Sequence, residues 1–168
     1  MISETAAAHP IVTALQRESS SWLVSAIVAL GELTLEVEAD RVVHVCRFLR
    51  EEKSFNRIST ITAVDRFPVE PRFEVVYHLY SVTLKQRVRV RARVESADPE
   101  IDSVIPVWEG ANWYEREVFD LFGIRFRNHP EMTRILMPEG WEGHPLRRDY
   151  PVHGHRYDYA ETEGGSTL

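Results

Sequence analysis

Two neighbouring segments, residues 73–80 and 87–94, alternate between apolar and polar residues, and this alternation constrains the fold more than any other feature. A period of two places successive side chains on opposite faces of a strand, so both segments are predicted to be strands with one apolar face. The short loop between them predicts an antiparallel hairpin. Its apolar face requires a second layer, which the helical segments of the chain can supply.

The other regular elements are predicted from the same kind of periodicity. Strands are expected over residues 22–28, 33–37 and 58–64, and helices over residues 9–17 and 40–53. Asp40 is expected to be the N-cap of the second of these helices. Cys46 lies on its apolar stripe, which favours a buried core residue over a reactive thiol.

The predicted fold class is α+β, with a mixed β-sheet and helices packed on one face, followed by a short helix and an extended C-terminal arm. We assign residues 1–106 to the α+β domain and residues 107–152 to the interaction helix and the arm. Residues 153–168 form a polar tail in this division. The sequence contains no internal repeat that would indicate a different architecture.

The helix before the arm is predicted from its capping residues and its apolar stripe. Asn112 is expected to be the N-cap and Glu115 to complete a capping box, and Gly123 suits the left-handed C-terminal position. Arg116 and Asp120 are one turn apart, a spacing that allows an ion pair. The apolar stripe consists of Tyr114, Val118, Leu121 and Phe122.

The arm that follows, residues 124–151, combines prolines and glycines with large apolar side chains. Proline lacks an N–H group and disfavours helix in the residue before it, so the arm is predicted to be irregular. Trp141, Leu146 and Tyr150 are its candidate anchors. We expect these anchors to be buried on another protein rather than on the domain that carries them.

Composition excludes several classes of function. The net charge of the 168 residues is -6, which argues against nucleic acid as the main partner. A single cysteine, Cys46, excludes an internal disulfide framework and an iron–sulfur cluster held by this protein alone. The longest apolar run, residues 22–30, is much shorter than the ~20 residues of a membrane-spanning helix. We therefore expect any membrane association to be indirect, through other subunits.

Four arginines in the second strand of the hairpin are expected to line the face opposite the helices. They are Arg87, Arg89, Arg91 and Arg93. This row is the best candidate in the sequence for an anionic ligand, although a solvated charged face is the more usual reason for such a pattern. Glu74 is placed to neutralise part of the row across the hairpin. No aromatic residues are interleaved with the arginines, so nucleic-acid binding is not expected.

A metal-dependent hydrolase is the enzymatic alternative. Its ligands would come from His129, His144, His153 and His155, with Glu131, Glu142 or Asp149. Zinc hydrolases favour close pairs such as H-E-x-x-H on a helix, whereas these histidines lie in loop sequence beside proline or glycine. We therefore expect His144 to form a hydrogen bond with the backbone or with a carboxylate in the arm.

Several long motifs resemble one family. The runs E-R-E-x-x-D-L-F-G-I-x-F, H-P-E, R-I-L-M-P-E and W-E-G-H-P-L-R-R-D-Y-P are similar to the signature of the smaller hydrophilic subunit of bacterial NADH:quinone oxidoreductase, or respiratory complex I. The resemblance covers roughly residues 24–152. The sequence differs from the usual pattern at Met132, Thr133, Gly140 and Arg148, which affects local contacts only.

The resemblance implies a structural subunit of the peripheral arm of a proton-translocating enzyme that braces the quinone-site subunit, the larger hydrophilic subunit with which this family pairs. It implies no catalytic, cofactor or metal residue on this protein, because FMN and iron–sulfur clusters are held by partner subunits. The implied location is the cytoplasmic face of the bacterial plasma (inner) membrane, as a peripheral protein. The equivalent subunit of a membrane-bound hydrogenase or a ferredoxin-fed complex is the alternative.

Residues of the interaction helix and the arm are the candidates for the subunit interface, because charged and aromatic side chains are dense there. The candidates are Glu115, Arg116, Glu117, Asp120, Trp141, His144, Arg147, Arg148, Asp149 and Tyr150.

Overall fold

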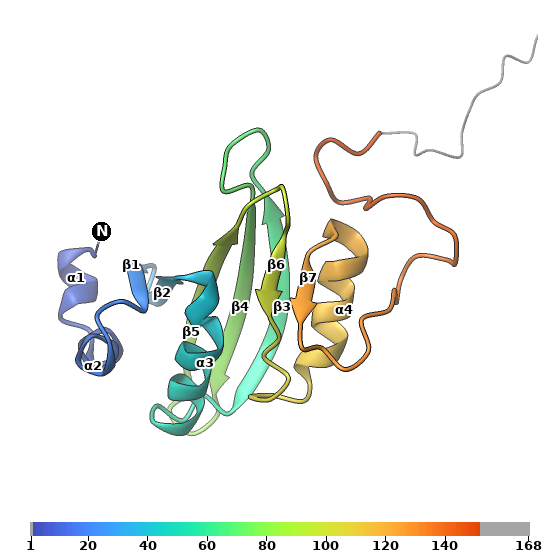
Figure 1. Cartoon of the computed structure of the whole chain (residues 1–168). Coiled ribbons are helices and arrows are strands. Elements are labelled where there is room, and N and C mark those ends of the chain that lie inside the picture. The colour runs from blue at the N-terminus through green and yellow to red at the C-terminus, as the bar shows by residue number, and fades with distance from the viewer. Residues whose placement is uncertain (1, 152–168) are drawn as a thin grey trace, which may run out of the picture.

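The computed structural model describes residues 2–151, and a five-stranded mixed sheet forms its centre (Figure 1). The order of the strands across the sheet is β1-β2-β5-β4-β3. The pairing is antiparallel except between β2 and β5, which are parallel. The strands are β1 (Leu23–Ala29), β2 (Glu32–Val37), β3 (Arg57–Asp65), β4 (Phe73–Ser81) and β5 (Gln86–Val94).

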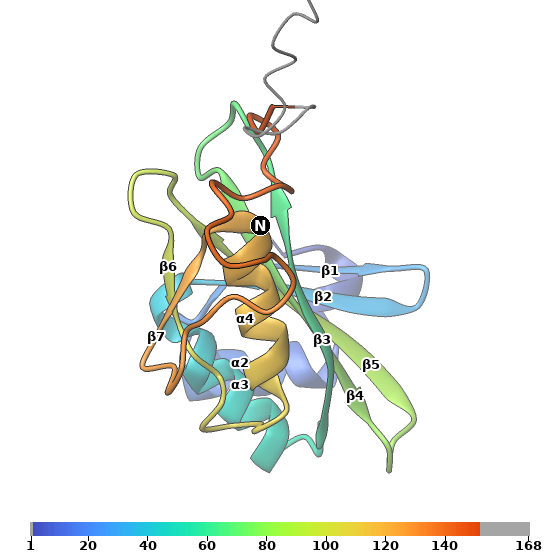
Figure 2. The same ribbon diagram turned by 90° about the vertical axis from the view of Figure 1, so that its right-hand side faces the viewer.

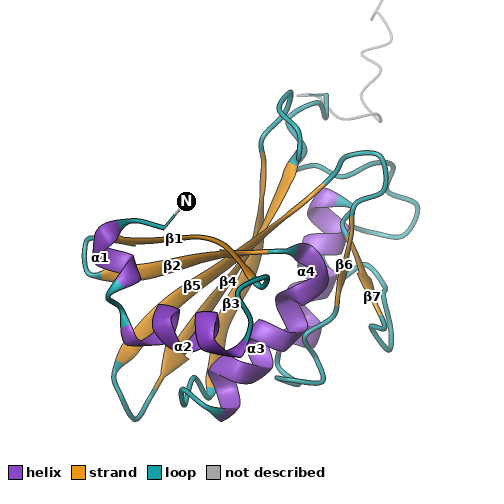
Figure 3. Cartoon of the chain, turned by 60° about the vertical axis from the view of Figure 1, so that its left-hand side comes forward, coloured by secondary structure: helices purple, strands orange, loops and turns teal. Residues whose placement is uncertain are grey.

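Helices cover one face of this sheet, as predicted for the α+β class (Figure 3). The helices are α1 (Glu4–Ala7), α2 (Pro10–Glu18), α3 (Val42–Glu51) and α4 (Ala111–Phe122). Pro10 is the first residue of α2, where its missing N–H group leaves no hydrogen bond unmade. No helix within residues 2–151 covers the opposite face of the sheet.

The predicted β4–β5 hairpin is confirmed, and its register explains the position of the core. Tyr77 pairs with Val90, and both side chains are fully buried on the side of the helices. Arg89 pairs with His78 on the opposite face. Cys46 in α3 is fully buried, and burial raises the pKa of its thiol, so it is the inert core residue that the sequence predicted.

Several short elements differ from the prediction. A second, two-stranded parallel sheet pairs β6 (Glu100–Asp102) with β7 (Arg125–Arg127) beside α4, where a loop and the start of the arm were expected (Figure 2). Asp40 does not cap α3, because it lies in a 3-10 turn, Ala39–Arg41, that precedes the helix. Elements of three residues are too short for periodicity to reveal them. The polar tail assigned to residues 153–168 lies outside the described residues.

Candidate functional site

Glu115 connects α4 to the interior of the domain and does not form the capping box that its spacing predicted. The helix begins one residue earlier than expected, with Gly110 as its N-cap, so Asn112 lies inside it. The Glu115 side chain is fully buried, and its carboxylate accepts hydrogen bonds from Ser103 Oγ and from the Val104 N–H, both at 2.7 Å. These tertiary partners replace the local one because the carboxylate faces the core, away from solvent.

Burial raises the pKa of Glu115 to about 7, although the hydrogen bonds from Ser103 and Val104 act in the opposite direction. Burial also raises the pKa values of the neighbouring Tyr77 and Cys46, and the charge of Glu115 adds to this effect. The Tyr77 hydroxyl is buried and has no hydrogen-bond partner within residues 2–151. A titratable carboxyl group therefore lies in the core at the contact between α4 and the sheet.

Asp120, on the same helix, fixes the first part of the arm. Its Oδ2 accepts hydrogen bonds from three consecutive backbone N–H groups, those of residues 135, 136 and 137, at distances of 2.7–3.0 Å. Its Oδ1 accepts one from Arg134 Nη1 at 2.9 Å. Burial raises the pKa of Asp120, but these donors outweigh burial and hold the pKa below its ordinary value. The arm is thus attached to a charged, fully buried carboxylate.

The predicted ion pair between Arg116 and Asp120 is wrong, because each residue binds the arm instead. Arg116 donates hydrogen bonds to the carbonyl oxygens of Thr133 and Arg134, at 3.1 and 3.3 Å. Two helix residues one turn apart therefore hold the same stretch of arm, one through its carbonyl groups and one through its N–H groups.

The end of α4 accepts the next part of the arm. Gly123 has φ +73°, the left-handed C-terminal conformation that the sequence predicted. Arg147 Nε donates to the Phe122 carbonyl, and His144 Nδ1 lies 2.9 Å from the Asp120 carbonyl oxygen. A Cβ atom on Gly123 would lie 2.5 Å from both Arg147 and His144. The glycine is therefore required by its backbone conformation and also by the close approach of the arm.

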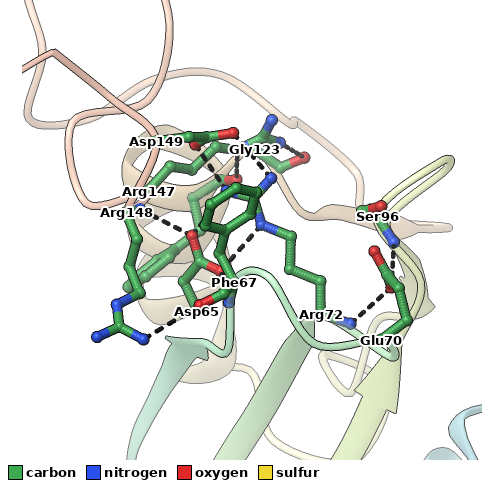
Figure 4. Close-up of polar contacts among 10 residues, drawn as sticks. Asp65, Phe67, Glu70, Arg72, Ser96, Gly123, Arg147, Arg148 and Asp149 are labelled. Atoms are coloured by element: carbon green, nitrogen blue, oxygen red, sulfur yellow. Dashed lines mark hydrogen bonds and ion pairs between the residues drawn. The ribbon is translucent and has the colours of Figure 1, made fainter.

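A cluster of charged residues fastens the end of the arm to the loop between β3 and β4 (Figure 4). Arg72 donates two hydrogen bonds to Asp65, at 2.8 and 2.9 Å, and two to Asp149 of the arm, at 2.6 and 2.9 Å. The backbone N–H of Arg148 donates to Asp65 Oδ2 at 2.8 Å. Burial raises the pKa of Asp65, but Arg72 and the backbone donors of Arg148 and Phe67 lower it to about 2. Asp65 is therefore ionised in the folded protein.

The apolar side chains of this region point outward, in contrast to its charged groups. Trp113 on α4 and the arm residues Leu136 and Leu146 are 61%, 54% and 52% exposed. Trp141 and Tyr150 are half-buried, and the Tyr150 hydroxyl donates to the Glu142 carbonyl at 3.3 Å. The charged groups of the arm therefore bind its own domain, whereas several large apolar side chains remain in contact with solvent.

The structure does not gather the ten candidate residues into one network. Asp120 and His144 lie together at the end of α4, Asp149 belongs to the cluster around Arg72, and Glu117 is exposed. Sequence reasoning did not identify several residues that hold these groups, namely Asp65, Arg72, Ser103 and Arg134. The available signal for Arg72 was its position beside a proline in the loop between two predicted strands.

Within residues 2–151, no three histidine, cysteine, aspartate or glutamate side chains lie close enough together to hold a metal ion. His129 Nδ1 accepts a hydrogen bond from the Glu131 N–H, and His144 binds backbone as predicted. His153 and His155 lie outside the described residues. No helix in the same part of the sequence is long and apolar enough to cross a membrane.

Solved structures with a similar fold come from respiratory complexes. One is the structure titled "Nqo5 of the trypsin-resistant fragment (1-134) in P63 form", with a TM-score of 0.63 and 30% identity over 71% of this chain and 96% of that one. Another belongs to the membrane-bound sulfane sulfur reductase, an archaeal respiratory membrane complex, with a TM-score of 0.70 and 30% identity over 84% of each chain.

Sequence comparison identifies the family within this class. The family described as "Respiratory-chain NADH dehydrogenase, 30 Kd subunit" matches residues 35–156. A subunit of the NADH-quinone oxidoreductase of Geobacter sulfurreducens is 53% identical over 74% of this chain and 77% of that protein. The protein of the same name from Geotalea uraniireducens is 44% identical over 85% of this chain and 87% of that one. The chain therefore belongs to the 30-kDa subunit family of respiratory-chain NADH dehydrogenase, as the resemblance in its motifs predicted.

Proposed function

We propose that this protein is a structural subunit of the peripheral arm of a bacterial NADH:quinone oxidoreductase and that it braces the quinone-site subunit. In this proposal the electrons pass through FMN and iron–sulfur clusters in partner subunits, and this protein holds no cofactor. Electron transfer between fixed cofactors depends on their spacing, so the contribution of this subunit is positional. It lies at the cytoplasmic face of the plasma membrane and is held there by its partners.

The observation that carries the proposal is the way in which the arm presents Leu136 and Leu146. The N–H of Leu136 donates to Asp120 Oδ2 at 2.7 Å, and the N–H of Leu146 donates to the Leu121 carbonyl at 3.0 Å. Both backbones are thus fixed on the domain, while about half of each side chain is exposed. Apolar side chains on a preordered backbone suit a protein interface, because little conformational entropy is lost on binding.

The ten candidate residues take different roles in this proposal. Asp120, Arg147 and Asp149, together with Arg116, His144 and Arg148, hold the arm in its bound shape. Trp141 and Tyr150, beside Glu117, are placed to touch the partner. Glu115 acts from below the surface by holding α4 on the sheet.

The proposal is tested by tagging this protein in its native bacterium, solubilising the membranes in mild detergent and identifying the co-purified proteins by mass spectrometry. We expect to recover the quinone-site subunit, the flavin and iron–sulfur subunits and the membrane subunits, together with NADH:quinone activity. A tagged protein that is recovered alone, under conditions that preserve respiratory complexes, would contradict the proposal.

A related assembly is a second candidate, because the fold is also similar to a chain of the sulfane sulfur reductase complex at 30% identity. That complex has a different activity. Relatives named as NADH-quinone oxidoreductase subunits reach 53% identity, which favours the first candidate. The same purification separates the two, because a related assembly would yield a hydrogenase-like large subunit and no NADH:quinone activity.

A further inference from the structure

The face of the sheet that no helix covers within residues 2–151 carries the predicted arginine row, and the structure divides this row into two parts. Arg91 and Arg93 are neutralised by two acidic residues. They lie 2.9 and 3.2 Å from Glu36 and 3.9 and 3.8 Å from Glu74. Glu74 was the predicted partner, and Glu36 on β2 is a second one. This half of the row is therefore a structural ion-pair network.

The other half has an excess of positive charge. Arg87 and Arg89 share one carboxylate, that of Glu32, at distances of 3.9 and 3.3 Å. Arg57 on β3 adds a third guanidinium group and has no ion pair within the described part of the sequence. The strand order brings these residues to the same end of the face, because Arg57 pairs with Tyr80 and Tyr80 pairs with Arg87.

These side chains line an open hollow of about 660 Å³, which also contains hydroxyl groups and one imidazole. The hydroxyl groups belong to Ser59, Thr60 and Tyr80, and the imidazole belongs to His78. Burial lowers the pKa of His78, and Arg89 and Arg87 lower it further against the opposing effect of Glu32. The imidazole is therefore neutral at pH 7 and offers one donor and one acceptor. Its low pKa reports the positive potential of the hollow.

We propose that this hollow, formed by Arg57, Arg87 and Arg89 with the hydroxyl groups and His78, binds the phosphate group of a small phosphorylated molecule. Three guanidinium groups face a single carboxylate, so the local excess of two positive charges matches a dianionic phosphate monoester. Guanidinium groups bind phosphate oxygens through paired, charge-assisted hydrogen bonds. Hydroxyl groups complete such sites by donating to the remaining oxygens.

The size of the hollow indicates an organic ester rather than free phosphate. A phosphate group occupies a small part of about 660 Å³, and the Tyr80 ring lies at the same site as a surface for an organic moiety. The site is separate from the arm, because none of its lining residues belongs to residues 107–151. Its occupancy is therefore independent of the interface proposed for the arm.

The His78 ring provides a direct probe, because a bound dianion stabilises the imidazolium form and raises its pKa. The full-length protein would be titrated with pH by NMR in inorganic phosphate and in sodium chloride at equal ionic strength, with the His78 signal assigned by its loss in His78→Gln. We expect phosphate to raise the pKa of His78 saturably at millimolar concentrations. Identical titrations in the two salts would overturn the proposal.

Two variants and a second ligand make the test specific. The double variant Arg87→Gln/Arg89→Gln is expected to weaken phosphate binding by at least about tenfold, because each charge-assisted contact is lost. Arg47→Gln, which changes an exposed arginine on α3, is the matched control and should leave binding unchanged. ADP is expected to bind more tightly than phosphate at the same residues. Equal affinity for the two ligands would overturn the assignment to an organic ester.

Discussion

At the scale of single residues, Glu115 and Asp65 are both buried carboxyl groups, yet their pKa values are about 7 for the first and about 2 for the second. The difference lies in their donors. Glu115 has two neutral donors, whereas Asp65 has the Arg72 guanidinium and two backbone N–H groups. A sequence shows neither the burial nor the partners, because those partners come from other elements.

Glu115 is expected to make the protein less stable as the pH rises from about 4.5 to 7. The folded state binds the proton more tightly than the unfolded state, whose pKa is about 4.3, so stability is greatest below that value and falls until the folded carboxyl ionises. The shift corresponds to a loss of roughly 3 kcal/mol in the free energy of unfolding. Glu115→Gln keeps a donor and an acceptor without the charge and should remove this loss.

Urea unfolding of wild type and Glu115→Gln between pH 5 and pH 8 measures this effect. Glu117→Gln, at an exposed position of the same helix, is the control and should follow wild type. Parallel curves for wild type and Glu115→Gln across this range would show that Glu115 does not titrate there.

Asp65 is expected to have the opposite pH dependence. Its folded pKa lies below the unfolded value of about 3.9, so its stabilisation is present above pH 4 and is lost as the pH falls through 2. Asp65→Asn should reduce the free energy of unfolding by about 2 kcal/mol at pH 7, and by less at pH 3. Asp98→Asn, which removes an exposed ion pair with Arg125, should cost less than about 1 kcal/mol. A cost for Asp65→Asn no larger than that of Asp98→Asn would contradict the assigned role.

At the scale of elements, the long periodic segments were predictable and the side-chain partners at their ends were not. The strands of the hairpin and the position of Gly123 followed from period and from backbone conformation, which are local properties. The capping box at Asn112 and the Arg116–Asp120 pair also followed local rules, and both were wrong. The carboxylates face the core and the arm, where buried backbone N–H groups offer partners that helix geometry alone does not reveal.

The arm segment around Arg134 should open when Asp120 loses its charge. Asp120→Asn replaces one carboxylate oxygen by an NH2 group, so either the backbone N–H groups or Arg134 must face a donor. Leaving buried groups unpaired costs about 1–3 kcal/mol. Tryptic cleavage after Arg134 is therefore expected to become at least about tenfold faster. Glu139→Gln, an exposed change in the same arm, should be cleaved at the wild-type rate, and equal rates for both variants would contradict the role of Asp120.

At the scale of the whole molecule, the sequence predicted the class of sheet, the side that the helices cover and the outward arginine row. It did not predict how the arm divides its contacts. Charged residues were candidates for the surface of the partner, but Asp149 and Arg147 bind the domain that carries them. The apolar residues are left outside, because a thin segment without a hydrophobic face of its own cannot cover both of its sides.

The exposed leucines of the arm should therefore matter for assembly and not for folding. Leu136→Asp and Leu146→Asp replace half-exposed side chains whose backbone hydrogen bonds remain, so each should change the free energy of unfolding by no more than about 0.5 kcal/mol. At an interface the same change buries an unpaired charge, which costs several kcal/mol. Recovery of partner subunits with the tagged double variant should fall at least about tenfold.

The matched control is Leu84→Asp on the β4–β5 hairpin, where the leucine is 51% exposed. It introduces the same charge at the same degree of exposure but away from the arm. We expect it to co-purify with the partner subunits as wild type does and to have the same thermal unfolding midpoint as the arm variants. Full recovery of partners with the arm variants would mean that the partner surface lies elsewhere on the domain. The polar contacts of the arm would then serve folding alone.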